Sequence, residues 1–169
     1  MTASKYIVDI IEDVVDSMTL ECYYLYGHPV EVVNTLSEWS KHPTKKTEKF
    51  PLIMLFQDFE ERKGTMQGIN SEVSLNIVIA TNTLNSYKSE ERYTNNFKAI
   101  LYPLYDEFID RIKLSGYFES TLFPHNKFDR VYWGKTGLYG NDGNMFNDFI
   151  DAIEIQNLDL KILNNFKNC

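Results

Sequence analysis

The stretch from Phe50 to Thr83 constrains the fold of this chain more than any other, because it predicts two long strands that pair with each other. Its first seven residues, Phe50 to Phe56, are too apolar for a half-solvated strand, so we expect this strand to be covered on both faces. From Val73 onward apolar and polar residues alternate, which is typical of an antiparallel partner with one buried and one wetter face. The charged segment 60–72 between the strands is too long for a tight turn, and we expect it to project from the body as a loop.

Two helices are predicted from apolar residues that recur every three or four positions. The first runs from Ser4 to about Met18. Its acidic outer face is typical of a solvated helix surface, although a ring lumen or a basic partner would also suit it. The second begins at Ser89 and carries an apolar stripe as far as Gly116, which is long enough to lie across a sheet. Pro103 interrupts the stripe, so we expect either a kink near residues 99–103 or two successive helices.

Shorter patterns complete the predicted fold. Residues 22–26 indicate a short strand, and Pro29 is suited to open a helix after it. Residues 127–133 and 149–163 predict a second antiparallel pair, and the alternation in the last strand slips at Gln156 and Asn157, as it does at a β-bulge. The glycine-rich segment 134–146 predicts a second projecting loop. We therefore expect a single α+β domain over residues 1–169, with a mainly antiparallel sheet of four or five strands, an N-terminal helix and a long helix packed across one face.

Charge and cysteine content narrow the class of protein. The net charge of -7 argues against a protein that grips nucleic acid over a broad surface, because that affinity comes from clustered Lys and Arg. The two cysteines, Cys22 and Cys169, do not indicate a disulfide framework, so we expect folding in a reducing compartment. The acids among the apolar residues of the N-terminus are incompatible with a secretory signal or a membrane span there.

The sequence contains no recognisable motif for catalysis or for binding a cofactor or a metal ion. The triplet Gly134-Lys135-Thr136 resembles the end of a phosphate-binding loop, but Asp129 stands where that loop needs its first glycine. The three histidines lie far apart and form no spaced ligand pair with each other or with a cysteine. Adjacent carboxylates such as Glu60 and Glu61 do not by themselves converge on a substrate. The sequence therefore predicts a protein that is not an enzyme and that has no catalytic residues, no cofactor and no metal site.

The order of the predicted elements resembles that of a known family. An early helix, a short strand that ends at Tyr26-Gly27, the apolar strand Phe50-Pro51-Leu52-Ile53-Met54-Leu55, a charged loop, a second strand, a long helix and a final strand pair follow one another. This layout is similar to that of the tail terminator or tail completion proteins of bacteriophages, over roughly residues 4 to 163. The lysine-rich segment 40–49 and the glycine-rich segment 134–146 depart from the shorter members of that family.

The resemblance implies a structural virion protein. Such a subunit would form a homo-oligomeric ring, of six or twelve copies, at the portal, neck or tail end of the particle. It would join head and tail parts, contact portal, connector or tail proteins, and line the DNA passage without binding DNA specifically or contacting a membrane. The location implied is the virion, assembled in the host cytoplasm. The alternative that we weigh is an acidic cytoplasmic chaperone or adaptor that acts as a dimer.

Seven residues are the candidate contacts between subunits or with a partner. Three belong to the tip of the central loop: Arg62, Lys63 and Met66. Four lie in or beside the glycine-rich segment: Tyr132, Trp133, Leu138 and Tyr139. For Tyr132 and Trp133, packing in the core at the end of a strand is an equally good interpretation.

Overall fold

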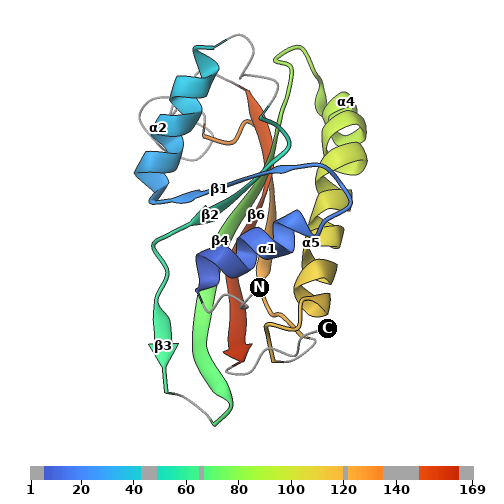
Figure 1. Ribbon diagram of the computed structural model, residues 1–169. Helices are drawn as coiled ribbons and strands as arrows, with labels where there is room; N and C mark the ends of the chain where they lie inside the picture. Colours follow the sequence, from blue (N-terminus) through green and yellow to red (C-terminus); the bar gives the residue numbers. More distant parts are fainter. Residues whose placement is uncertain (1–5, 43–48, 65–66, 120–121, 135–148, 164–169) are drawn as a thin grey trace.

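The structure is a computed structural model that describes residues 6–42, 49–64, 67–119, 122–134 and 149–163. Figure 1 shows the elements in chain order: α1 (Ile7–Asp16), β1 (Tyr23–Gly27), α2 (Pro29–Ser40), β2 (Leu52–Phe56), β3 (Glu61–Lys63), β4 (Ile69–Asn82), α4 (Ser89–Arg92), η1 (Tyr93–Leu101), α5 (Tyr102–Leu114), β5 (Asn126–Arg130) and β6 (Ile150–Leu163). The chain is therefore an α+β protein, as the sequence predicted.

The sheet differs from the prediction in size and in strand direction. It has six strands in the order β1-β2-β4-β6-β5, with β3 paired to β4. The β1–β2 pair is parallel and the other pairs are antiparallel. The sheet is mostly antiparallel, as expected, but the expected number of four or five strands was wrong and the parallel pair was not foreseen. Helix α2 connects β1 to β2 and so lets them run in the same direction, and β3 adds a strand where a loop was expected.

The centre of the sheet follows the sequence pattern closely. Strand β2 is buried on both faces from Leu52 to Leu55 and pairs antiparallel with β4, with Ile53 opposite Ile79. Strands β4 and β6 are both 14 residues long and pair along their length. Their register shifts between Leu75 and Ile77, and Asn157 on the facing strand has φ of 55°. The predicted bulge at residues 156–157 is confirmed.

One face of the sheet is covered by α1 and by the long helix, which consists of the consecutive elements α4, η1 and α5. In Figure 1, α1 crosses in front of β4 and β6, and the long helix runs down beside them. The core on this face includes Ile10 and Ile11 of α1 and Phe108 of α5. The long helix changes from π-helix to α-helix near Pro103, where a disturbance was expected. The π-helix η1 ends at Leu101, and Pro103 lies in the first turn of α5, where its missing N–H is tolerated.

The other face is covered over only part of its area. Helix α2 packs Val32 and Leu36 against Val78 and Ala80, which are buried. Toward the other end of β4 the same face carries Ser74 and Asn76, which are exposed, and Glu72, which is half-buried. The predicted wetter face is therefore real at Ser74 and Asn76, whereas Val78 lies in a second core. This uncovered half leads directly to the β3–β4 hairpin.

Candidate assembly surface

Strand β3 and the start of β4 form a hairpin that extends the sheet beyond the helices (Figure 1). Arg62 pairs with Glu72 and Lys63 with Ser71 across the two strands. The predicted loop 60–72 is therefore partly a strand pair, because a charged three-residue strand at a sheet edge can stay solvated on its outer side.

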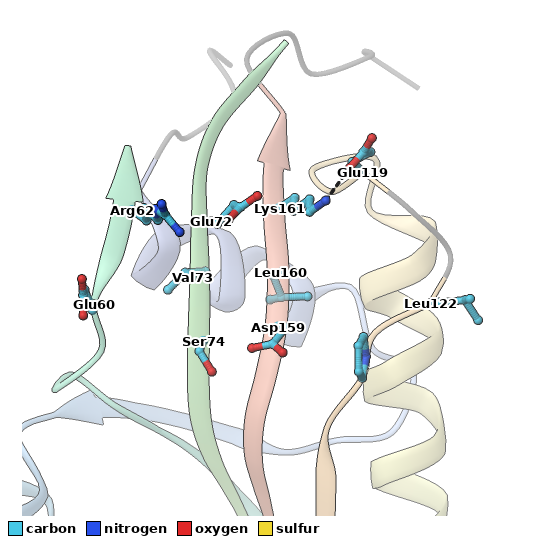
Figure 2. A pocket seen from close by; sticks show the side chains of 11 residues that line it. Glu60, Arg62, Glu72, Val73, Ser74, Glu119, Leu122, Asp159, Leu160 and Lys161 are labelled. Atoms are coloured by element: carbon cyan, nitrogen blue, oxygen red, sulfur yellow. Dashed lines mark ion pairs between the residues drawn. The ribbon is translucent and has the colours of Figure 1, made fainter. Parts of the chain in front are cut away.

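A row of alternating charges crosses the uncovered half of the sheet. Arg62 on β3 lies beside Glu72 on β4, and Glu72 lies beside Lys161 on β6. Lys161 forms an ion pair with Glu119, with Nζ and Oε2 3.6 Å apart. Figure 2 shows Arg62, Glu72 and Lys161 on three neighbouring strands, with Ser74 and Asp159 in the next row of β4 and β6. Cross-strand neighbours of opposite charge stabilise a sheet by about 0.2–1 kcal/mol per pair, so the row is compatible with exposure to solvent.

This part of the sheet is the floor of a groove with a volume of about 630 Å³. Glu119, Leu122 and Pro124 form one side, where Leu122 is 79% exposed, and β3 forms the other. Arg62, Glu72 and Asp159 make no ion pair with other described residues, although all three line the groove. Charges without an ion-pair partner in the subunit can be matched by opposite charges on a partner protein.

A second, smaller hollow of about 370 Å³ continues the groove along the same strands. Phe56, Asn76 and Gln156 line it together with the bulge residue Asn157. The Asn157 backbone N–H donates a hydrogen bond to Asn76 Oδ1 at 3.2 Å, which fixes the bulge against β4. The polar residues Glu72, Ser74 and Asn76 therefore follow one another on this face of β4, from the hairpin to the bulge.

A buried polar cluster holds the opposite end of the sheet. Arg92 donates to Asp151 Oδ1 at 2.9 Å, and the two side chains are 4% and 0% exposed. Asn96 donates to Asp151 Oδ2 at 2.8 Å, and the Tyr132 backbone N–H donates to Asp151 Oδ1 at 3.1 Å. The Arg92 guanidinium carbon also lies 3.8 Å from the centre of the Tyr132 ring. Every polar group in the cluster is satisfied, so its role is to anchor the long helix and the end of β5 to β6.

The structure separates the predicted interface residues into three groups. Arg62 and Lys63 are exposed on the hairpin. Tyr132 has φ of 51° and belongs to the buried cluster, while Trp133 is 6% exposed and donates from Nε1 to Glu154 Oε1 at 2.9 Å. Their surroundings agree with the core interpretation. The other three lie outside the described residues: Met66, Leu138 and Tyr139. An interface role for any of the seven stays a prediction.

Sequence reasoning missed the groove floor. Glu72, Asp159 and Lys161 lie on one face only because of the register between strands that are far apart in the chain. A signal was present in each strand alone, since polar residues recur at every second position over residues 72–76 of β4 and again at residues 159 and 161 of β6. That signal assigns the residues to a face but does not say which residues are neighbours.

The ionisable groups with shifted pKa values lie on the helix side. Burial tends to raise the pKa of Glu107, but hydrogen bonds from the backbone and hydroxyl of Thr19 and from the backbone of Leu20, with the charge of Arg111, outweigh burial and lower it. Burial first, and then the charges of Glu107 and Asp16, raise the pKa of Cys22 to about 11. Glu107 thereby ties the α1–β1 connection to α5.

Among the described residues, no cluster of His, Cys, Asp and Glu side chains is arranged to hold a metal ion. Within the same part of the chain, no helix combines the length and the apolar character that crossing a membrane requires. Comparison of the chain with protein-family models, with curated proteins and with solved structures gives no match. The chain is therefore an α+β protein with a mixed, mostly antiparallel sheet.

Proposed function

We propose that this protein is a non-enzymatic structural subunit that closes into a ring at the portal, neck or tail end of a bacteriophage particle. In this role it joins head and tail parts and surrounds the DNA passage. The observation that carries the proposal is the combination of a projecting β3–β4 hairpin with a sheet face that α2 leaves half uncovered. The order of elements, which resembles that of phage tail terminator proteins, supports the same class.

A ring needs two different adhesive surfaces on each subunit, because a head-to-tail contact repeats around the axis. The groove beside the hairpin supplies one such surface. Its charges at Arg62, Glu72 and Asp159 lack ion-pair partners among the described residues. A neighbouring subunit can therefore supply the opposite charges without breaking an existing ion pair. Docking on this face requires no rearrangement of the core, since both cores lie beneath the helices.

The outer face of α1 supports a path for DNA that does not hold it. Four acids are exposed on this helix: Asp9, Glu12, Asp13 and Asp16. The sequence of α1 contains no Lys or Arg. A surface of this kind repels phosphates, so DNA slides past it where it faces a lumen.

The test is the native mass of the purified protein over a concentration series, followed by negative-stain imaging of the largest species. Closed rings with a central hole are the expected result, in the presence of the adjoining virion protein if the free subunit stays monomeric. Arg62→Glu should weaken assembly strongly, while the new like-charge pair with Glu72 should lower the melting temperature only slightly. Lys98→Glu makes the same charge change on the exposed side of the long helix and serves as the matched control.

The groove also favours one alternative, a dimeric chaperone or adaptor that binds a partner peptide beside Leu122. A compact dimer at every concentration, with no ring in the presence of virion proteins, would support the alternative over the ring. Equal loss of assembly in the Arg62 and Lys98 variants would show that net charge, and not the groove, controls association.

A further inference from the structure

The two ends of the sheet are strands with one free edge. Within the part of the chain that the structure describes, β1 pairs with β2 alone and β5 pairs with β6 alone. In β1, the Tyr23 N–H donates to Pro51 O at 3.0 Å and the Gly27 carbonyl accepts from the Gln57 N–H at 2.8 Å. In a parallel ladder alternate residues face the partner, so Tyr24 and Tyr26 direct their backbone groups away from β2. No backbone partner for these groups is found among the described residues.

The opposite edge is also accessible and carries no unpaired charge. Four of the five residues of β5 are exposed. Lys127 pairs with Asp129 at 2.7 Å, and Arg130 pairs with Glu154 at 3.2 Å. A second strand that covered β5 would therefore leave no buried charge without a partner. An unpaired buried charge is the usual penalty for covering a charged edge.

We propose that β5 of one subunit pairs with β1 of a second copy of this chain, so that the sheets of neighbouring subunits become continuous around the ring. This inference rests on the proposed ring function and adds to the groove a second contact, between the sheet edges of neighbouring subunits. The two edges are different surfaces at opposite ends of one sheet, so the contact is head-to-tail. Each subunit uses its β5 edge on one neighbour and its β1 edge on the other, and the contact can repeat around the ring.

Strand direction supports this pairing. Strand β1 runs with β2, β2 against β4, β4 against β6, and β6 against β5. Strands β1 and β5 of one subunit therefore run in opposite directions. In a ring whose axis lies along the strands, rotation to the next subunit preserves direction, and β5 meets the neighbouring β1 antiparallel.

The side chains at the two edges are complementary. Tyr26 is 49% exposed, and its ring lies 5.9 Å from that of Tyr24 on the face covered by α1. Lys127, which contacts the Tyr102 ring of α5, is on the same face of the sheet. Tyr23 and Phe128 are each 37% exposed. Paired edges thus bring aromatic rings on β1 beside a cation and an aromatic ring on β5, which are favourable cross-strand neighbours.

The pairing is tested by cross-linking in a background of Cys22→Ala and Cys169→Ala. The double variant Tyr26→Cys with Lys127→Cys places one thiol on each edge, and a short bismaleimide should join successive subunits into a ladder of covalent multimers on a denaturing gel. Leu114→Cys with Lys127→Cys is the matched control, because Leu114 is exposed at the end of α5, away from both edges. No ladder is expected for it.

A second variant tests the backbone bonds themselves. Tyr26→Pro removes the outward N–H and blocks approach of another strand, while Tyr26→Thr keeps the N–H and removes only the ring. We expect the proline variant to raise the concentration for half-assembly at least tenfold relative to the threonine variant. Circular dichroism and the melting temperature show whether each variant is folded.

The outcomes separate the edge contact from the ring itself. A ladder specific to the Tyr26 and Lys127 pair supports the inference. Rings that form without that ladder, and that tolerate Tyr26→Pro, overturn the edge contact and leave the ring function standing. Cross-linked dimers from Tyr26→Cys alone indicate a two-fold contact and also overturn the inference. A protein that forms no ring with or without virion partners refutes the proposed function, and the edge contact with it.

Discussion

Replacing Arg92 by Met tests whether the buried cluster at the end of the sheet holds the long helix in place. Methionine keeps most of the volume of the arginine stem but removes the charge. Asp151, which is 0% exposed, would then keep its hydrogen bonds from Asn96 and from the Tyr132 backbone but lose its ion-pair partner at 2.9 Å. The bonds from Arg92 to the carbonyls of Leu84 and Tyr87 would be lost as well.

The expected cost is large because the remaining carboxylate cannot reach water. Removing one partner of a buried pair typically destabilises a protein by about 3–5 kcal/mol. A domain of this size loses roughly 2–4 °C of melting temperature per kcal/mol, so the melting temperature should fall by about 6–20 °C. Urea unfolding followed by circular dichroism measures the free energy of unfolding directly.

The double variant Arg92→Met with Asp151→Asn is the control. It leaves a neutral side chain that still accepts a hydrogen bond, so it should be more stable than Arg92→Met alone even though it departs further from the natural sequence. A loss below about 1 kcal/mol for Arg92→Met would refute the reasoning, because the carboxylate would then be hydrated without its partner.

Two further predictions follow from the shifted pKa values. Because the pKa of Glu107 is lowered in the folded state, its contribution to stability is present above its ordinary value of 4.5 and is lost as the pH falls through the lowered value. Glu107→Gln should therefore unfold more easily than the natural protein at pH 7, and urea titrations should show the difference shrinking in acid; a difference that is constant with pH would contradict this. In a Cys169→Ser background, the raised pKa of about 11 for Cys22, against 9.0 without the shift, should slow labelling by a thiol reagent at pH 8 about a hundredfold relative to the urea-unfolded chain. Equal rates in the two states would show that burial does not protect the thiol.

The local elements could be predicted because each one carries its own periodicity. The apolar spacing of Ile7, Ile10, Ile11 and Val14 gave α1, and the alternation along β6 even located the bulge at residues 156–157. Gly116, with φ of 74°, follows the end of the long helix as expected. In these cases neighbours in sequence decide the structure, so the pattern contains the answer.

The arrangement of the strands could not be predicted, because it depends on partners far away in the chain. Five residues from Tyr23 to Gly27 indicate a strand but contain no information about whether it runs parallel to β2. The charged row on the uncovered face needs Arg62, Glu72 and Lys161 in register, and no local pattern fixes that register. For this reason Arg62 and Lys63 could be named from the sequence as candidate contacts on the hairpin, whereas the groove beside them could not be predicted.

The pairing of β4 with β6 also has a consequence for how the chain acquires its structure. Strands β2 and β4 are close in sequence, and they can meet early, whereas Ile79 must find Ile153 across the whole long helix. Long-range antiparallel pairing of this kind slows folding, since the entropy of closing a large loop is lost before the contacts form. Until β6 arrives, β4 exposes an apolar edge and the core beneath α1 is incomplete. A partly folded subunit in which β6 has not yet paired is therefore prone to aggregate. Correct folding requires β6 to pair with β4 before two such subunits associate.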